Sequence, residues 1–471
     1  MIEYRVAPFV KLIYSKDSLI VVAPDNIVEL ELEASLFIES ATGNWVGYAK
    51  DAQELNNLGV LISNVEMNEY IELLYRLETY FATQNMRVRL TKKGATQLSA
   101  SIEGYAYFFD SQDDESVGYG MDSNKWLAML KATAEFYERI SCSYVRNSYH
   151  SGNSIRSLPI NSLMKYEGWQ IDSRDFEYQN APSGYWIEAR SIDHELIAGV
   201  PLEYQCYPDG IDGPKLCSAN SNGVAAHHDI NSALVGSIYE LIERDSLILH
   251  WFNKIPREQI KMPKIYAQRV NKLSTLGFTV RAINLTLELA PVIMVMITRH
   301  GDKFPRHVLG LASAPTAMAA LDKALSEVEL SVTYYDKEMS YPVKQEHVRA
   351  VISHQLWYDL PQNNDEIKFF FNNEVIDIEE IVDGPHDVAS INKELKSQGF
   401  DWYYTILNPD GNKITGICTV RSIVPSLVPI TFGYGCEPLA MDRLHNPPFY
   451  FTGLLDKSRF TEEGYKVQPF A

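Results

Sequence analysis

The stretch from Gly236 to Arg244 reads Gly-Ser-Ile-Tyr-Glu-Leu-Ile-Glu-Arg, inside a pattern that predicts one long helix over Asn231 to Phe252. Its two carboxylates, Glu240 and Glu243, are three residues apart and therefore share one face of the helix. The residues between and beside them are mostly apolar, so we expect both carboxylates to be largely buried. A buried carboxylate without a partner is costly, and this helix therefore needs cations beside it.

The same pattern occurs about a hundred residues earlier in the chain. There it reads Lys131-Ala-Thr-Ala-Glu135-Phe-Tyr-Glu138-Arg139, again with two glutamates three residues apart. A weaker third copy, Lys323-Ala-Leu-Ser-Glu327, lies after Gly236–Arg244 in the chain. These copies predict a degenerate structural repeat, although its period is too long for a solenoid.

The paired glutamates indicate a site for Mg²⁺ and a nucleotide. Mg²⁺ prefers oxygen ligands and usually binds through one or two carboxylates plus substrate phosphates. Two facing Glu-x-x-Glu pairs can hold two or three Mg²⁺ ions that bridge the phosphates of ATP. The neighbouring basic residues can bond phosphate or fix the carboxylates, and these are Lys131, Arg139 and Arg244. Gly236, one turn before Glu240, leaves room for a ligand beside the helix.

Other interpretations of these residues stay open. Each Glu-x-x-Glu-Arg can be a salt-bridged helix face, and a di-iron carboxylate bundle also uses glutamate pairs. The di-iron site needs a His three residues after a Glu, which neither helix has. Gly-rich phosphate loops are absent from the sequence. We interpret His227-His228 as loop residues rather than a metal site, before a helix capped by Asp229 or Asn231, because adjacent histidines cannot share one face.

Size and composition limit the class of protein. The 471 residues suggest two or three domains, or one large and one small domain. A net charge of -19 disfavours nonspecific binding to nucleic acid. The five cysteines include no Cys-x-x-Cys pair, which argues against a disulfide framework and a zinc ribbon. Without a signal peptide or an apolar run of ~18 residues, we expect a cytoplasmic protein that does not enter membranes.

The pattern along the chain predicts an α+β (mixed α/β) fold with two domains. A small winged-helix-like domain covers residues 1–95, and an ATP-binding catalytic domain covers residues 100–471. In the small domain we expect strands and then helices, over Lys11–Tyr14, Ser18–Val22, Val28–Leu32, Glu33–Ser40, Ala49–Leu58 and Glu69–Thr83. In the large domain we expect strands over Tyr105–Phe109, Thr279–Ile283, Pro291–Thr298, His307–Ala312 and Val424–Phe432. The long helices are expected over Asn124–Tyr144, Asn231–Phe252 and Ala317–Tyr335, and Asn363–His386 is expected to be a peripheral insertion.

Four segments resemble, in order and spacing, the motifs of the YcaO superfamily. The first is Gly118-Tyr-Gly120 with Ala128 and the Glu135 to Arg139 pattern, and the second is Ser221-Asn222-Gly223-Val-Ala-Ala with Glu240 to Asp245. The third is the segment Ala320 to Glu327. The fourth, similar to the closing segment of the azole-forming branch, is Arg421 to Tyr434. The resemblance spans roughly residues 105 to 471.

This resemblance implies a YcaO-like fold of pseudo-repeated strand–helix units and an ATP-dependent peptide-modifying enzyme. Such enzymes bind ATP through glutamate pairs and Mg²⁺ and phosphorylate a backbone amide oxygen. A Cys, Ser or Thr side chain attacks the amide carbon, and loss of phosphate leaves a thiazoline or oxazoline. Carried over by motif, the metal site comprises Glu135, Glu138, Glu240 and Glu243. The nucleotide pocket adds Lys131, Arg139, Asn222, Arg244, Lys323 and Glu327.

The leading hypothesis is therefore a cyclodehydratase acting on a ribosomally made precursor peptide, similar to that of microcin-type systems. A YcaO-type enzyme that uses sulfide or an amine, and so forms a thioamide or an amidine, is one alternative. An inactive leader-binding scaffold is another. One departure from the family is Lys131, which stands where many relatives have a small hydroxyl residue.

The resemblance also implies partners and a role for the C-terminal tail. The azole branch often ends in alternating prolines whose terminal carboxylate reaches the active site, and here Pro469 and Ala471 are the candidate catalytic residues. The leader of the peptide would add as a strand to an edge near Val28–Leu32 or Leu19–Val22. A ubiquitin-activating-like protein, a flavin-dependent dehydrogenase and a second copy in a homodimer are further candidate partners.

Overall fold

The computed structural model describes most of the chain, namely residues 4–14, 18–25, 27–31, 37–38, 45–46, 55–57, 60–63, 66–92, 105–112, 116–143, 149–151, 157–172, 185–193, 197–205, 220–299, 304–335, 341–342, 344–448 and 457–470. The chain splits into two compact units. The first comprises Met1–Gly94, Glu103–Ile140 and Asp410–Ile417, and the second comprises Ala95–Ile102, Ser141–Pro409 and Cys418–Ala471. The predicted functional domains, 1–95 and 100–471, stay a prediction.

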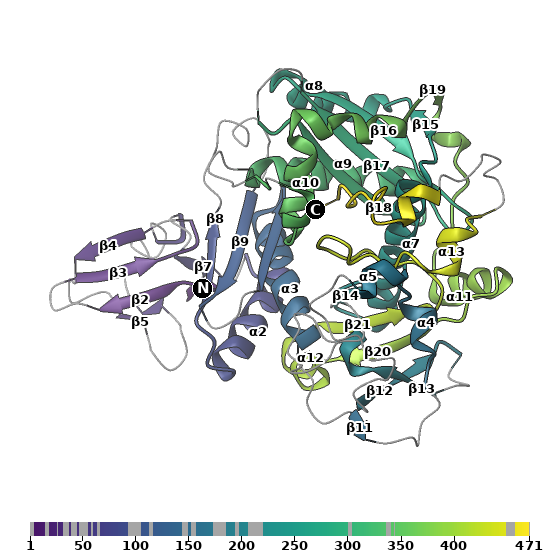
Figure 1. The fold of residues 1–471 in the computed structure, drawn as a ribbon. Coiled ribbons are helices and arrows are strands. Elements are labelled where there is room, and N and C mark those ends of the chain that lie inside the picture. Colours follow the sequence, from purple (N-terminus) through teal and green to yellow (C-terminus); the bar gives the residue numbers. More distant parts are fainter. Residues whose placement is uncertain are drawn as a thin grey trace. The chain divides into compact units, whose positions relative to one another are not determined.

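Short antiparallel sheets begin the first unit (Figure 1). They pair β1 (Tyr4–Val6) with β7 (Leu61–Ser63), β5 (Phe37–Ile38) with β6 (Trp45–Val46), and β3 (Ser18–Val22) with both β2 (Lys11–Tyr14) and β4 (Ile27–Glu31). The predicted hairpin and third strand are confirmed. The leader edge proposed at Leu19–Val22 is wrong, because β3 is the central strand.

The helices predicted after these strands have mixed outcomes. The helix expected over Glu33–Ser40 is wrong at Phe37–Ile38, where an aromatic and a β-branched residue pair with β6 instead. Residues 55–57 are helical as predicted, and the rest of the predicted helix Ala49–Leu58 lies outside the described residues. The helix predicted over Glu69–Thr83 is confirmed as α2. It begins where the Asn68 side chain accepts the N–H groups of Tyr70 and Ile71. The winged-helix identity of this region stays a prediction.

A three-stranded sheet and two helices form the core of the first unit. The sheet has the order β10 (Val117–Asp122), β9 (Tyr105–Ser111), β8 (Val88–Lys92), and its helices are α2 and α3 (Lys125–Ser143). Phe81 of α2 and Phe136 of α3 both contact Phe109 of β9 and each other, with ring centroids 4.9–5.5 Å apart. Both helices therefore cover the same face of the sheet.

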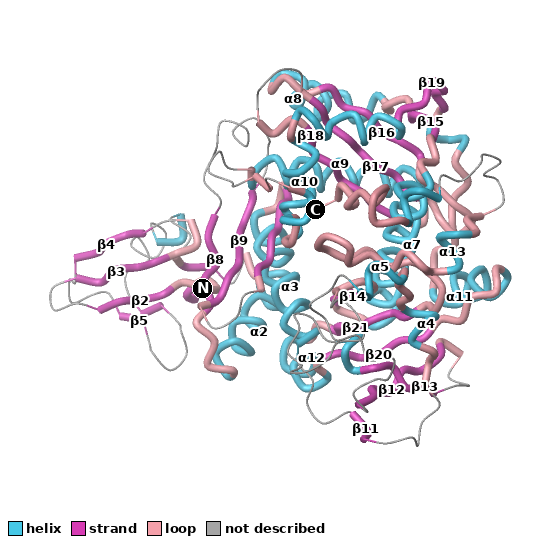
Figure 2. Tube along the Cα trace, in the orientation of Figure 1, coloured by secondary structure: helices cyan, strands magenta, loops and turns pink. Residues whose placement is uncertain are grey.

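Two larger sheets organise the second unit (Figure 2). One has the order β11 (Tyr149–Ser151), β12 (Tyr185–Ser191), β20 (Tyr403–Leu407), β21 (Cys418–Ile423), β14 (Val224–His227), with β13 (Ile197–Pro201) also paired to β12. The other has the order β18 (His307–Ser313), β17 (Val292–Thr298), β16 (Thr279–Asn284), β15 (Arg257–Ile260), β19 (Phe371–Ile376). β17 and β18 are buried along their whole length.

Helix α7 (Ile230–Asn253) connects the two sheets, because it packs on β14 and β21 of one and on β17 and β18 of the other. Asp229 caps its start by accepting the Ser232 N–H at 2.9 Å, and Lys254 ends it in the left-handed conformation. Helix α9 (Ala317–Tyr334) covers β17 and β18, and α8 (Ala267–Thr275) covers β16. Shorter helices complete the unit, including α4 (Ile160–Leu163), α5 (Gly168–Asp172), α6 (Leu202–Gln205), α10 (Val351–Asp359), α11 (Val388–Ser397) and α13 (Asp442–His445).

The mixed α/β fold is confirmed, with two corrections. The strand expected over Val424–Phe432 is wrong: β21 ends at Ile423, Pro425 and Pro429 lack the N–H that a sheet needs, and Ser426 has φ 80°. The stretch Asn363–His386 is not a peripheral insertion, because β19 within it pairs in parallel with β15. Among the described residues, no helix is both long and apolar enough to cross a bilayer.

Candidate functional site

The site rests on a strand–helix unit that occurs three times. In each copy a glycine precedes a glutamate by 17 residues, and the pairs are Gly118–Glu135, Gly223–Glu240 and Gly310–Glu327. The glycine lets the helix lie directly on its strand. A Cβ at Gly118 would stand 2.0 Å from the Ala132 carbonyl oxygen, and one at Gly310 would stand 2.2 Å from that of Ala324. The predicted structural repeat is therefore present in the backbone packing of the first and third copies, whereas a Cβ at Gly223 would stand 2.5 Å from the Ser422 carbonyl oxygen of β21.

Each of these glutamates is held by a backbone N–H at its glycine. Oε2 of Glu135 accepts from the Tyr119 N–H at 2.7 Å, and Oε2 of Glu240 accepts from the Gly223 N–H at 2.7 Å. Oε2 of Glu327 accepts from the Leu311 N–H at 3.0 Å. One carboxylate oxygen is thus fixed by the backbone and the other is left for a second partner.

An arginine one turn later takes the second oxygen in two of the copies. Arg139 Nη2 lies 2.7 Å from Glu135 Oε1, and Arg244 Nη2 lies 2.9 Å from Glu240 Oε1. The third copy has Ser331 at that position, so Glu327 lacks the local cation that the other two copies have. The alternative of a salt-bridged helix face therefore describes part of the first two copies but not the third.

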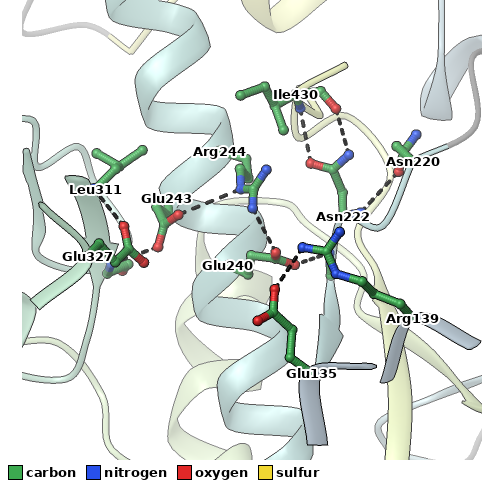
Figure 3. A network of polar contacts seen from close by, with 12 residues as sticks. Glu135, Arg139, Asn220, Asn222, Glu240, Glu243, Arg244, Leu311, Glu327 and Ile430 are labelled. Atoms are coloured by element: carbon green, nitrogen blue, oxygen red, sulfur yellow. Dashed lines mark hydrogen bonds and ion pairs between the residues drawn. The ribbon is translucent and has the colours of Figure 1, made fainter. Parts of the chain in front are cut away.

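Two half-buried carboxylates in the second unit, Glu243 and Glu327, have little positive charge beside them among the described residues (Figure 3). Glu243 accepts the Ser313 N–H at 3.2 Å, and its Oε1 is 3.6 Å from Arg244 Nε, which has no hydrogen-bond partner within the described part of the chain. Burial, and then the neighbouring Glu327, hold the pKa of Glu243 well above its usual range. Burial also raises the pKa of Glu327 to about 7, against the opposing effect of Arg244 and Lys323. Such an oxygen-rich, negatively charged donor set fits Mg²⁺, which would supply the missing charge.

The structure places the remaining predicted residues as follows. Lys131 bonds Asp122 at 2.8 Å and the Met121 carbonyl at 3.3 Å. Glu138 lies half-buried on α3, one turn after Glu135. Glu135 and Glu138 belong to the first unit and Glu240 and Glu243 to the second, so the convergence of the four glutamates stays a prediction.

Asn222, predicted in the nucleotide pocket, has its side chain engaged elsewhere. It is 2% exposed, donates to the Ile430 carbonyl at 2.7 Å and accepts the Ile430 N–H at 3.1 Å. Nearby, the buried Asp245 accepts the Val428 N–H at 2.8 Å and pairs with Arg443 at 2.8 Å. These contacts were not predicted from the sequence. They hold residues 428–430 against the turn before β14 and against α7, the helix that carries Glu240.

The C-terminal tail runs through the interior of the second unit. Its backbone carbonyls accept hydrogen bonds from buried side chains, with Trp251 bonding Lys466 at 3.0 Å and His354 bonding Gln468 at 2.8 Å. The Arg244 guanidinium carbon is 5.7 Å from the centre of the Phe470 ring. The predicted catalytic residue Pro469 is therefore next to a residue whose ring lies near Arg244, while Ala471 lies outside the described residues.

A pocket of about 630 Å³ lies beside the first turns of α7 and α9. It is lined by His227, Asn231, Ser232, Val235, Gly236, Tyr239, Pro315, Lys323, His386, Asp387, Val388 and Ala389. Gly236 and Lys323 were singled out from the sequence, and both line it. The interpretation of both histidines as loop residues is wrong for His227, which is the last residue of β14. The premise that adjacent histidines cannot share one face is also wrong here, because the rings of His227 and His228 are 4.3 Å apart at their centres.

The family of the chain follows from a comparison with protein-family models. Residues 118–428, which include all three strand–helix units, match the model described as YcaO cyclodehydratase, ATP- and Mg²⁺-binding. The chain belongs to the YcaO cyclodehydratase family. The predicted family, its class of ATP-dependent enzyme and its ligands ATP and Mg²⁺ are confirmed at this level. A search of curated protein sequences finds no match.

Solved structures of YcaO proteins share this fold. A heterocyclase in complex with substrate and cofactor is 15% identical with a TM-score of 0.62, over 75% of this chain and 52% of that one. A YcaO protein from Methanopyrus kandleri bound with AMPPCP and Mg²⁺ is 14% identical with a TM-score of 0.59, over 77% and 91%. The E. coli microcin synthetase McbBCD complex with pro-MccB17 bound is 13% identical with a TM-score of 0.53, over 81% and 96%. This chain thus spans about half the length of the first of these proteins.

Proposed function

We propose that this YcaO protein is an ATP-dependent cyclodehydratase that converts Cys, Ser or Thr residues of a ribosomally made precursor peptide into thiazolines or oxazolines. The observation that carries the proposal is the Glu243–Glu327 pair, which is half-buried, fixed by backbone N–H groups and, among the described residues, short of positive charge. Stable proteins rarely keep such a pair without a ligand. Mg²⁺ bound with nucleotide phosphates supplies the charge that the pair lacks.

The reaction balances without any further reagent. The side-chain thiol or hydroxyl attacks the carbon of the preceding amide and loses its proton. The amide oxygen takes the γ-phosphoryl group of ATP, and ADP leaves. The carbon–oxygen bond then breaks, phosphate leaves and the nitrogen loses a proton to form the C=N bond of the ring. Phosphorylation is needed because an unmodified amide oxygen is a poor leaving group.

The residues of this chain act by positioning and charge. Glu243 and Glu327, with the predicted partners Glu135, Glu138 and Glu240, would hold Mg²⁺, and the ion would neutralise phosphate charge in the transfer. Arg244 shares its guanidinium between Glu240 and Glu243, and Arg139 bonds Glu135. Both arginines are therefore fixed near carboxylates rather than free to swing, which favours a preorganised site.

The C-terminal tail supplies a candidate base. The contact of Phe470 with Arg244 supports the proposal that the Ala471 carboxylate accepts the proton of the attacking group. Adding a few residues after Ala471 should abolish turnover and leave ATP binding intact. Full activity of the extended protein would end this part of the proposal.

The decisive experiment is co-expression with a short Cys-, Ser- and Gly-rich peptide encoded beside the gene, followed by mass spectrometry. Loss of one water per modified residue means cyclisation, and replacement of an amide oxygen by sulfur means thioamide formation. An unmodified peptide that still binds the protein indicates the scaffold alternative. The Glu243→Gln variant is the control, since it should return the unmodified peptide while remaining folded.

The N-terminal region is the proposed leader-binding part. Among the described residues β4 pairs only with β3, which makes β4 the remaining candidate edge. Successive N–H groups of a strand point to opposite sides, so only one of the variants Glu29→Pro and Leu30→Pro removes a donor from the free side. That variant should weaken binding of a fluorescent leader peptide more than the other; equal affinities would argue against β4. The cytoplasmic location and the further protein partners belong to this proposal.

A further inference from the structure

We propose that His227, His228 and Asp229 bind a divalent transition-metal ion of the Zn²⁺ type at the rim of the pocket beside α7. This site lies outside the carboxylate cluster and is independent of the proposed reaction. Its three ligand atoms, one from each residue, all lie within 4.8 Å of one another. The site would be the second kind of metal site in the chain, and it would select a different ion.

The distances fit a shared ion better than direct hydrogen bonds. His227 Nδ1 and His228 Nε2 are each 3.4 Å from Asp229 Oδ2. A charge-assisted hydrogen bond is shorter, about 2.7–2.9 Å. Two ligands on one tetrahedral Zn²⁺, at bonds of about 2.0–2.1 Å, stand roughly 3.3–3.4 Å apart. The three residues are thus spaced for an ion between them.

Local structure fixes this spacing. His227 is the last residue of β14, and Asp229 is the N-cap of α7, so both ends of the cluster are held by regular structure. Asp229 Oδ1 accepts the Ser232 N–H at 2.9 Å, which leaves Oδ2 for a second partner. The capping carboxylate also offsets the positive end of the helix, which would otherwise disfavour a cation.

The donor atoms decide the class of ion. Imidazole nitrogens suit Zn²⁺, Co²⁺, Ni²⁺ and Cu²⁺, whereas Mg²⁺ prefers oxygen ligands only. Cys418 lies directly opposite His227 in the β14–β21 register, which adds a soft donor on the same face of the sheet. The histidine cluster should therefore take up a transition metal in the presence of excess Mg²⁺, while the glutamates keep Mg²⁺.

The pocket indicates what such an ion can bind. His227 belongs to the cluster and also lines the pocket of about 630 Å³. An ion with three protein ligands keeps at least one position open. A thiol or an imidazole of a molecule in the pocket is the chemical group that this position would take.

The test is a titration of the full-length protein with Co²⁺ in excess Mg²⁺, followed by visible absorption. We expect one equivalent to give the d–d bands of nitrogen-liganded Co²⁺. His228→Gln and Asp229→Asn should each weaken binding by about 10- to 100-fold or more. Asn caps helices as well as Asp does, so Asp229→Asn removes the ligand without removing the cap, and an unchanged melting temperature checks this.

Two comparisons make the result decisive. His347→Gln changes another exposed histidine, on the 3-10 turn Gln345–His347, and should leave the titration unchanged. Glu243→Gln should also keep the Co²⁺ bands, because the proposed ion is not held by the glutamates. The proposal is overturned if the wild-type protein gives no bands, if His228→Gln binds as well as wild type, or if Glu243→Gln removes the bands.

Discussion

The α7 and α9 copies of the strand–helix unit differ in one feature of charge. Both fix a glutamate oxygen with a strand N–H, at Gly223 for Glu240 and at Leu311 for Glu327. Glu240 then pairs with Arg244 on its own helix, whereas the third copy has Ser331 in that place. The shared backbone therefore sets where a carboxylate points, and a single residue one turn later decides whether it needs an external cation.

Removing one carboxylate from the Glu243–Glu327 pair should have the largest effect on activity. Glu243→Gln is expected to lower peptide-dependent ATP consumption about a hundredfold or more, because a bound metal ion contributes several kcal/mol to such transfers. The same change should raise the melting temperature of the metal-free protein, since it removes the repulsion from Glu327. Glu240→Gln should also lower activity but should lower the melting temperature, because it leaves Arg244 without its closest partner.

Glu329→Gln is the matched control for these variants. Glu329 is on α9 close to Glu327 in sequence, but it pairs with Arg269 at 2.7 Å and not with the cluster. ATP consumption should be unchanged in this variant while stability falls slightly. A similar rise in melting temperature for Glu240→Gln and Glu243→Gln would show that the two carboxylates do not differ as described.

Disrupting the close packing of helix on strand at one of the glycines should lower the stability of the protein. Gly310→Ala places a Cβ about 2.2 Å from the Ala324 carbonyl oxygen, so α9 must move off β18. We expect a loss of about 3 kcal/mol in the free energy of unfolding, measured in urea. Gly168→Ala, where no atom lies within 4 Å of the added carbon, should change stability little. Equal stability of both variants would contradict the close packing.

The stability of the metal-free protein should fall as pH rises toward neutrality. The pKa of Glu327 is raised to about 7 by burial, so the folded state holds a proton that the unfolded state releases above its ordinary value of 4.5. This contribution is complete below pH 4.5 and is lost as pH rises to about 7, with a size on the order of 3 kcal/mol. Melting curves of wild type and Glu327→Gln measure it, and saturating Mg²⁺ should remove most of the difference. A pH profile that is the same for both proteins without Mg²⁺ would contradict the prediction.

Adding an arginine to the third copy should have the smallest effect on stability. It tests directly whether a cation on the same helix competes with the metal ion. Ser331→Arg restores the spacing of Glu240–Arg244 on α9 and should stabilise the metal-free protein by roughly 0.3–0.5 kcal/mol. It should also weaken Mg²⁺ binding, because the arginine competes with the ion. Ser331→Gln adds length without charge and serves as the control in calorimetric titrations. Tighter Mg²⁺ binding by the arginine variant would refute the competition.

The long helices could be predicted from the sequence to within about a residue. Helices α2, α7 and α9 have strong apolar periodicity and begin at capping residues, at Asn68, Asp229 and Thr316. Short segments were less predictable. Phe37–Ile38 pairs as a strand with partners seven and nine residues away, and the apolar run after Ile423 is interrupted by prolines.

The local pairings of the candidate site residues were predictable from the sequence, but their distant supports were not. The glutamates and arginines carry a visible spacing, and their pairings within α3 and α7 are as the interpretation of locked carboxylates expected. The partners of Asp245 and Asn222 are Arg443 and Ile430, about two hundred residues away, and no local pattern points to them. The backbone contact that holds Glu327 could have been predicted, since the spacing between Gly310 and Glu327 is visible in the sequence.

That spacing has a use beyond this chain. Solved relatives with the same fold are only 13–15% identical, a level at which residue-by-residue alignment is uncertain. A glycine and a glutamate 17 positions apart mark the close approach of a strand and a helix at Gly118 and Gly310, and at all three positions they mark a glutamate held by a backbone N–H at or directly after the glycine. A search for three such pairs in one sequence could therefore identify distant members of the family. The residue four places after each glutamate would show in which copies an arginine on the same helix neutralises the carboxylate.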